Sequence, residues 1–346
     1  MAIEQTETLD RALQSAADRK ASDLFLLPDE PVTFRVKDRL IRSDGDALSE
    51  SEVRAIAIAA VGEERLATLG ESGSIYTSCS LRGVIDGQMT IASSRGQVTI
   101  VVRLITVKVM PVEAIKVPPA VLRAVESPGG LAIFTGRIGS GKTTTMLSVL
   151  DHLNLTAEKH ICTVEDPIEV SLTPKRSLVT QREVGLDVPD FVAGIGASLR
   201  QDADVIMVGE LRSHEAIQAC MTAAWVGRTV ITQLHATTPE KAIRRLYDVQ
   251  PPEHLPLFRR QLSESLRVIC AQVLLPAAKQ EMKVAAYGVL IPDAEIRSAI
   301  AEGRDITLRQ RPLPEGSIDI SDDIDRLRRE GTVTDEAARA ALDTLL

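Results

Sequence analysis

A glycine-rich segment with a lysine and two threonines in the middle of the chain contains the first residues that could do chemistry. Gly136, Gly141, Lys142 and Thr143 fit the pattern G-x-x-x-x-G-K-[ST], with an apolar run before it and good helix formers after it. Glycines permit positive φ and close approach, so successive N–H groups can point at phosphate oxygens, while Lys142 adds charge and the Thr143 hydroxyl coordinates Mg²⁺. A turn that only caps a helix has no use for that lysine and threonine. The predicted phosphate-binding residues are Gly136, Gly139, Ser140, Gly141, Lys142, Thr143 and Thr144.

Three strand ends supply further polar groups for this site. The run HICTVED ends at Glu165 and Asp166 before Pro167, the run DVIMVGE ends at Glu210, and the run TVITQLHA ends at His235. Open α/β sheets bind ligands at the carboxyl edge of their strands, so these side chains are expected to converge beside the phosphates. The carboxylates would position Mg²⁺ and water, and His235 would sense phosphate, although one histidine alone is more often a core side chain.

The elements that must position these residues alternate between buried strands and helices. Strand patterns at 131–136, 160–166, 204–210 and 229–236 are separated by helical patterns, which predicts a mostly parallel, doubly wound sheet. The last seventy residues are expected to be largely helical, with one strand-like run at 283–291. Ile324 and Leu327 indicate an amphipathic surface helix within the charged segment 322–331.

A different pattern precedes this region. Strand patterns at 22–27, 32–36, 74–83, 88–95 and 97–107, with helical patterns at 8–21 and 49–62, predict an α+β domain with an antiparallel sheet. Pro111, Pro118 and Pro119 interrupt both helix and ladder and indicate a linker. The predicted organisation is an amino-terminal domain at 1–110, a linker at 111–120 and a second domain at 121–346.

The composition is that of an ordinary globular protein and excludes several classes. The chain has 346 residues, is 44% hydrophobic and carries 40 Lys+Arg against 48 Asp+Glu, a formal net charge of −8. A pI near 5.3 disfavours nucleic-acid binding. Four dispersed cysteines without a CxxC pair argue against disulfides and a zinc ribbon. With no secretory signal or membrane-spanning run, a cytoplasmic protein is expected.

Several motifs in one order give a family resemblance. The glycine-rich loop, TVEDPIE, LRQDADVIMVGELR and TQLHATT resemble the secretion ATPase superfamily, which drives type IV pili and type II and type IV secretion. The resemblance is strongest to the twitching-motility retraction ATPases, the PilT-like branch, and includes ASDLFLLPDEPVTFRV and LSESLRVICAQVLLP. It implies a PAS-like domain followed by a RecA-like ATPase domain, and a homohexamer that binds ATP between domains and between neighbouring subunits.

The resemblance also implies roles for individual residues. Glu165 matches the family's Asp-box glutamate, Glu210 its atypical Walker B glutamate, and His235 the second histidine of its His box. Arg95 and Arg103, expected on the last strands of the first domain, match arginines that reach phosphates across the subunit interface. Without the resemblance, these two would be read as solvated strand charges.

Some positions depart from the family pattern. Arg228 stands where the first His-box histidine is usual, Ser213 where an aspartate follows GE-x-R, and Gln88 where an arginine is expected. Residues 295–299, EIRSA, occupy the place of the retraction branch's A-I-R-N-L motif. Nucleotide binding is expected to survive these changes, whereas fast hydrolysis and pilus retraction are the properties that they could alter.

The leading hypothesis is a hexameric ATPase motor for pilus retraction or a related secretion machine. It would act on an inner-membrane platform protein at the cytoplasmic face, and a related ATPase paralogue is a further candidate partner. A compact type IV secretion ATPase, an accessory ATP-binding subunit with weak turnover, and a nucleic-acid translocase are the alternatives.

Overall fold

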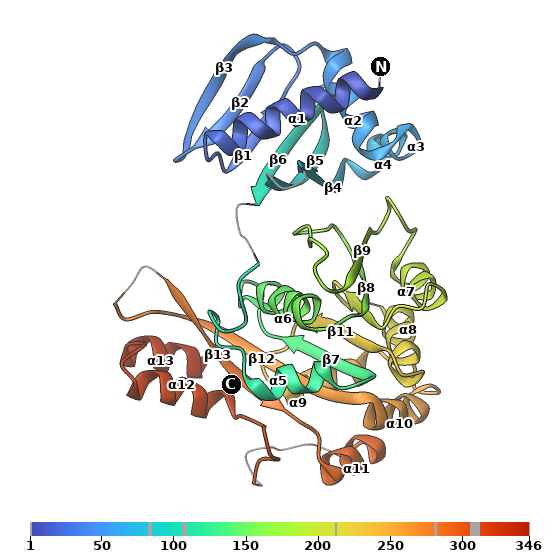
Figure 1. Cartoon of the computed structure of the whole chain (residues 1–346), viewed down its shortest axis with the longest axis vertical. Coiled ribbons are helices and arrows are strands. Elements are labelled where there is room, and N and C mark those ends of the chain that lie inside the picture. The colour runs from blue at the N-terminus through green and yellow to red at the C-terminus, as the bar shows by residue number, and fades with distance from the viewer. Residues whose placement is uncertain are drawn as a thin grey trace. The chain divides into compact units, whose positions relative to one another are not determined.

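The structure, a computed structural model, describes residues 2–81, 85–105, 109–211, 213–279, 282–304 and 312–345. It contains two compact units (Figure 1). The first comprises Met1–Lys108, Glu165–Leu172 and Gln181–Pro189, and the second comprises Val109–Val164, Thr173–Thr180 and Asp190–Leu346. Among the described residues, no helix has the length and apolarity needed to cross a bilayer. The predicted domain and linker limits were drawn from sequence pattern and stay predictions.

The first unit is built on a six-stranded sheet in which every pair is antiparallel, as expected. The strand order is β3-β2-β1-β6-β5-β4. The strands are β1 (Asp23–Leu26), β2 (Pro31–Val36), β3 (Arg39–Ala47), β4 (Ser74–Leu81), β5 (Ile85–Ser94) and β6 (Gln97–Ile105). The helices are α1 (Ala2–Asp18), α2 (Glu50–Val61), α3 (Glu63–Ala67) and α4 (Leu69–Ser72). Strand β3 was not predicted, because its sequence RLIRSDGDA is polar and mostly exposed.

Helix α2 begins where the sequence indicates. Ser49 and Glu52 form a reciprocal capping box: the Ser49 hydroxyl accepts from the Glu52 N–H, and the Glu52 carboxylate accepts from the Ser49 N–H at 2.7 Å. Val53, Ile56 and Ala57 then face the core of the first unit. Ser49 therefore caps α2, which lies within the helix predicted at 49–62.

A seven-stranded sheet of order β13-β12-β7-β11-β10-β8-β9 forms the framework of the site. Its strands are β7 (Gly130–Thr135), β8 (His160–Glu165), β9 (Leu178–Glu183), β10 (Val205–Val208), β11 (Thr229–Leu234), β12 (Leu266–Pro276) and β13 (Lys283–Leu290). Strands β8, β10, β11, β7 and β12 pair in parallel, and β13 is antiparallel to β12. The mostly parallel sheet is confirmed, and the pattern of β12 was missed.

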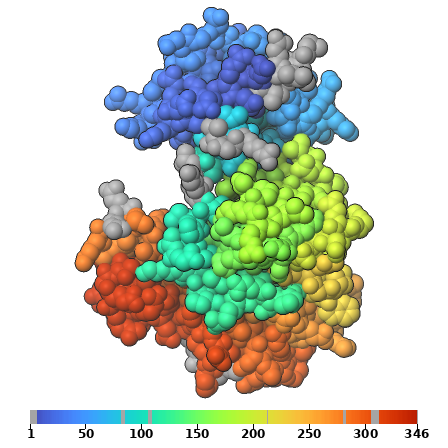
Figure 2. All heavy atoms as spheres, in the orientation of Figure 1, coloured from blue at the N-terminus to red at the C-terminus, as the bar shows by residue number. Residues whose placement is uncertain are grey.

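Helices of the second unit cover both faces of this sheet. They are α5 (Pro119–Glu126), α6 (Lys142–Thr156), α7 (Phe191–Arg200), α8 (His214–Trp225), α9 (Pro239–Asp248), α10 (Leu255–Ser265), α11 (Ala294–Glu302), α12 (Ile320–Arg329) and α13 (Asp335–Asp343). The side chain of Gln272 on β12 contacts α6 on one face of the sheet. Ala271 and Leu275 lie on the opposite face of the same strand and pack with α12 and α13. The β12–β13 hairpin (orange) and helices α12 and α13 (red) lie side by side on the surface (Figure 2).

Two expectations about helices have clear outcomes. Ile324 and Leu327 are buried in α12, which confirms the amphipathic helix predicted from their spacing. The end of the predicted linker is helical instead, because α5 begins at Pro119. Proline is tolerated at the first helical position, where its missing N–H would have had no partner within the helix.

Candidate functional site

The phosphate-binding loop (P-loop) connects the buried strand β7 to α6. Gly136 and Gly141 have φ of +153° and +85°, and both are crowded by β12. A Cβ on Gly136 would lie 2.5 Å from the Gln272 carbonyl oxygen, and one on Gly141 would lie 2.8 Å from Gln272 Nε2. Glycine is therefore required at Gly136 by conformation and by space, and at Gly141 by its positive φ. The N–H groups of the first turn of α6, which a helix cannot satisfy internally, face the loop.

Lys142 is the charged residue of the P-loop and is only 5% exposed. Its Nζ donates to the carbonyl oxygens of Gly136 at 3.0 Å and Arg137 at 2.9 Å. A third contact joins Nζ to His235 Nδ1 at 3.4 Å. Burial lowers the pKa of Lys142, and the charge of Glu210 opposes this change. The ammonium therefore bonds to the loop's own carbonyls and would have to exchange some of these contacts in order to bind phosphate.

His235 connects Lys142 to Glu210. A lysine ammonium can only donate, so Nδ1 of His235 accepts, which leaves the proton of the neutral ring on Nε2. Nε2 lies 2.9 Å from Glu210 Oε1 and donates to it. The structure thus brings Lys142, His235 and Glu210 together at the carboxyl edge of the sheet, as the strand ends predicted.

Thr135 fixes the end of the strand that carries His235. Its hydroxyl donates to the Ala236 carbonyl at 2.7 Å and accepts from the Ala236 N–H at 2.9 Å. Thr135 is the last residue of β7 and pairs with Leu234 of β11. The P-loop and His235 are therefore held by two neighbouring strand ends.

The remaining predicted carboxylate, Glu165, is buried at the end of β8. Its Oε1 accepts from Gln181 Nε2 at 3.1 Å, and both residues belong to the first unit. Strand β8 is the parallel neighbour of β10, which leads to Glu210. Glu165 therefore lies at the strand end where it was predicted, and its role in catalysis stays a prediction.

The two predicted arginines also belong to the first unit and lie at opposite ends of the β5–β6 hairpin. Arg95 was expected on a strand, but it occupies the turn before Gly96 with φ of +53°. A two-residue hairpin turn that matches the right-handed twist of its two strands needs positive φ at both of its residues. Arg103 lies on β6 with its side chain 77% exposed and Nε 3.5 Å from Asp23 Oδ1. Whether either arginine reaches a phosphate stays a prediction.

The departures from the family pattern have local structural explanations. Arg228 precedes β11, at the edge of the sheet opposite to His235, and pairs with Asp202 at 2.7 Å. The Ser213 hydroxyl caps α8 by accepting from the Ala216 N–H at 3.2 Å, a role that aspartate also fills. Gln88 of β5 lies opposite Arg103 in the register of β6.

Arg297, in the segment that replaces the A-I-R-N-L motif, holds the end of α10. Its guanidinium donates to the carbonyls of Ser263 and Leu266, at 2.5 and 3.0 Å. Burial lowers the pKa of Arg297, and Arg267 adds to the effect. The last carbonyl groups of a helix have no hydrogen-bond partner inside the helix. Arg297 supplies partners at the end of α10 and so stabilises the start of β12.

The loop residues fit a nucleotide phosphate chain with Mg²⁺. Within the described part of the chain, Ser140 Oγ is buried without a hydrogen-bond partner, which a phosphate oxygen would supply. Thr143 and Thr144 are half-buried in the first turn of α6. The hydroxyl of Thr143 and the carboxylate of Glu210 are hard oxygen donors, the type that Mg²⁺ prefers.

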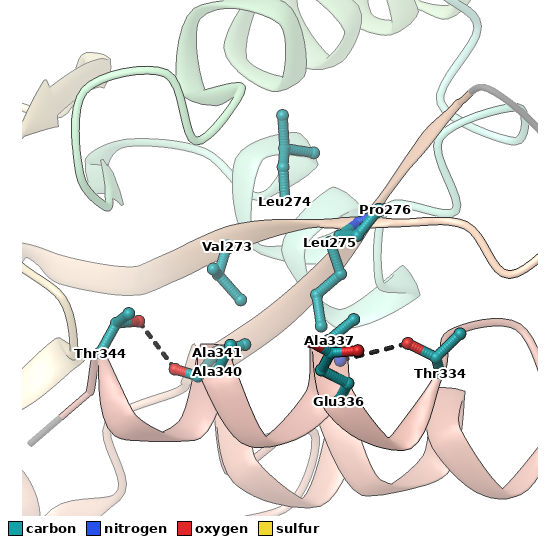
Figure 3. Close-up of a pocket in the computed structure, with 10 residues that line it drawn as sticks. All are labelled: Val273, Leu274, Leu275, Pro276, Thr334, Glu336, Ala337, Ala340, Ala341 and Thr344. Carbon is teal, nitrogen blue, oxygen red and sulfur yellow. Dashed lines mark hydrogen bonds between the residues drawn. The ribbon is translucent and has the colours of Figure 1, made fainter.

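A separate apolar pocket of about 440 Å³ lies between β12 and α13 (Figure 3). Val273 and Leu275 point toward the alanines of α13, while Leu274 points to the other side of the strand. The pocket adjoins the P-loop, because the Thr344 carbonyl accepts from the Arg137 guanidinium at 3.1 Å. None of the predicted phosphate-binding residues line it, so this pocket is separate from the predicted phosphate site.

Gln272 and Thr145 are site residues that the sequence analysis missed. Both are buried, and the Thr145 hydroxyl donates to Gln272 Oε1 at 2.8 Å beneath the loop. A signal for Gln272 does exist, because it is the one polar residue in the run VICAQVLL of β12. A polar side chain inside a buried strand needs a partner.

A P-loop after the first strand of a mostly parallel sheet, with a carboxylate and a histidine at neighbouring strand ends, defines a RecA-like nucleotide-binding protein. The family model described as "Type II/IV secretion system protein" matches residues 3–311, and the chain belongs to this family. The resemblance noted in the sequence is thereby confirmed.

Individual relatives agree with this assignment. The chain is 34% identical over 292 residues to the type IV pilus retraction ATPase PilT of Pseudomonas aeruginosa. This alignment covers 84% of this chain and 85% of the relative. A crystal structure of the pilus retraction motor PilT with bound ADP is 32% identical, with a TM-score of 0.80 and 94% of each chain covered. The Legionella pneumophila ATPase DotB has the same fold, with a TM-score of 0.84 at 24% identity over 98% of this chain and 96% of that chain.

Proposed function

We propose that this chain binds ATP with Mg²⁺ at the P-loop and hydrolyses it to drive a type IV pilus or a related secretion machine. The observation that carries the proposal is the connected set Lys142, His235 and Glu210 beside the loop. Support also comes from the similar crystal structure of the pilus retraction motor PilT, which contains bound ADP. Pilus retraction is the favoured task, since PilT is a retraction ATPase.

In this proposal each side chain has a distinct task. The P-loop N–H groups and Lys142 hold the phosphates, and Ser140 Oγ gains its partner there. Glu210 orients the attacking water, while the Nε2–H of His235 fixes the direction of its carboxylate. Glu165 helps to order water at the same edge. Thr143 and Glu210 would hold Mg²⁺, which would supply positive charge against the charge that develops on the phosphates.

The assembly proposed for this activity is a homohexamer. Arg95 and Arg103 lie on the first unit and supply positive charge to the phosphates of a neighbouring subunit. Hydrolysis then depends on ring assembly, and the partner that receives the motion is an inner-membrane platform protein. The chain acts at the cytoplasmic face of that membrane through this partner, and no nucleic acid takes part.

An accessory ATP-binding subunit with weak turnover is the second candidate. It is favoured by Gln88, which stands where the family pattern has an arginine and lies opposite Arg103 in the β5–β6 register. A subunit without that positive charge would turn ATP over slowly.

Steady-state ATPase activity and calorimetric nucleotide binding test the proposal. Lys142→Ala should abolish binding, and Glu210→Gln should bind ATP but hydrolyse it at least ~100-fold more slowly, as expected on losing a water-orienting group. Wild-type turnover in Glu210→Gln would exclude Glu210 as the water-orienting residue. Hexamers that bind ATP without turnover would favour the accessory subunit.

A further inference from the structure

The two ends of the P-loop rest on one residue of the neighbouring strand. The carbonyl oxygen of Gln272 lies against Gly136, and its side-chain Nε2 lies against Gly141. Gln272 is buried on β12, so it has no water to replace a lost partner. The shape of the loop and the placement of this glutamine are therefore linked.

Thr145 ties the same glutamine to the first turn of α6. It lies three residues after Lys142 and is buried, and its hydroxyl donates to Gln272 Oε1 at 2.8 Å. A movement of the first turn of α6 toward a phosphate would lengthen this bond unless Gln272 moved as well. Breaking it would leave the buried carbonyl oxygen of the amide unpaired, which is costly.

Tyr287 extends the contact to the segment before α5. It lies on β13 directly opposite Gln272, so the two side chains lie on the same face of the sheet. The phenol donates to the Ile115 carbonyl at 2.9 Å. Ile115 belongs to a turn at 111–117, which is closed by the bond from Val117 N–H to the Val112 carbonyl at 3.0 Å. Val112 and Val117 are buried, so this turn is anchored in the second unit.

We propose that Gln272 and Thr145 are positioning residues that hold the P-loop in its phosphate-binding shape, and that Tyr287 connects them to the backbone at Ile115. Nucleotide binding then alters the turn at 111–117, the stretch by which the chain enters the second unit. The inference rests on the proposed nucleotide binding and adds a route by which the P-loop signals to this turn.

Calorimetry with ADP tests the loop end of the connection. Thr145→Val and Gln272→Met remove the bond with little change of volume and should each weaken ADP binding about tenfold, the loss expected for a buried hydrogen bond. Because both remove the same bond, the double variant should bind about as weakly as Gln272→Met alone. Gln250→Met is the matched control, because Gln250 is a buried glutamine that bonds to His214 at 2.8 Å instead, and it should bind ADP normally.

Hydrogen exchange tests the other end. In the wild type, ADP should change the exchange of amides in 111–117, and in Tyr287→Phe, which keeps the ring, ADP should still bind while this change is lost. An unchanged ADP affinity in Thr145→Val and Gln272→Met, strictly additive losses, or an exchange response that persists in Tyr287→Phe would overturn the inference. A wild-type protein that binds no ADP would instead overturn the proposed function, and the inference with it.

Discussion

Lys142 is the residue on which the chemistry of the site depends most. Its ammonium is buried against two loop carbonyls and His235, and burial lowers its pKa from the ordinary value of 10.5. Glu210 opposes this effect through its negative charge. The carboxylate proposed to orient water therefore also maintains the charge that binds phosphate.

A pH titration of ADP affinity distinguishes this second role of Glu210. Affinity should fall once the pH exceeds the pKa of Lys142 in the free protein, since a neutral amine no longer attracts phosphate. Glu210→Gln removes the charge that raises this pKa, so the fall should begin at a lower pH than in the wild type. Asp204→Asn, a carboxylate change at the amino end of β10 that leaves Glu210 intact, should not move it. Superimposable profiles for wild type and Glu210→Gln would refute the coupling.

At the scale of elements, the sequence predicted what depends on local pattern and missed what depends on neighbours. Strands β7, β8, β10 and β11 were predicted, because each is an apolar run that leads to a glycine, a carboxylate or His235, whereas β12, which carries Gln272, was missed. Strand β3 was missed because its polar residues are held in place by pairing with β2, which only the folded sheet provides. Gln272 and Thr145 were missed for a similar reason, since their contact joins positions 127 apart.

Ser213 shows that a departure from the family pattern can keep its structural role. Ser213→Ala should destabilise the protein by about 1 kcal/mol, because the cap of α8 is lost, whereas Ser213→Asp should retain the cap and its stability. Thermal or urea unfolding measures both. If the alanine variant were as stable as the wild type, the cap would not account for a serine at this position.

Arg228 lies too far from the phosphates for its departure to affect turnover. Strand β11 separates it from His235, and six residues of strand span about 20 Å. We therefore expect Arg228→His to hydrolyse ATP within about twofold of the wild type, with a stability change of at most about 1 kcal/mol from the lost ion pair with Asp202. A tenfold change in turnover, measured beside a thermal melt, would show that this edge of the sheet is coupled to the site.

At the scale of the whole molecule, the candidate residues are divided between two units. Lys142, Glu210 and His235 are built into the second unit by strand pairing and direct contact, so each constrains the others. Arg95 and Arg103 were transferred from the family pattern and lie on the first unit at the two ends of one hairpin. The sequence could indicate the first group from pattern and order, whereas the role proposed for the arginines would depend on contacts between subunits, which no local pattern in one chain reveals.

Subunit mixing tests whether Arg103 acts on a neighbouring site. Arg103→Ala should lower turnover more than nucleotide binding, because an arginine in trans stabilises the transition state. Glu210→Gln subunits are inactive at their own site but still carry Arg103, so an equal mixture of the two variants should form complete sites at about a quarter of positions in a ring with head-to-tail contacts. ATPase activity above the sum of the separate variants, at concentrations where light scattering shows hexamers, would therefore identify Arg103 as a residue in trans.

Arg39→Ala, which removes an exposed arginine on β3 of the same sheet, is the control and should turn over normally on its own. Hexameric mixtures with no more activity than their components would refute a role in trans and leave Arg103 as the surface partner of Asp23.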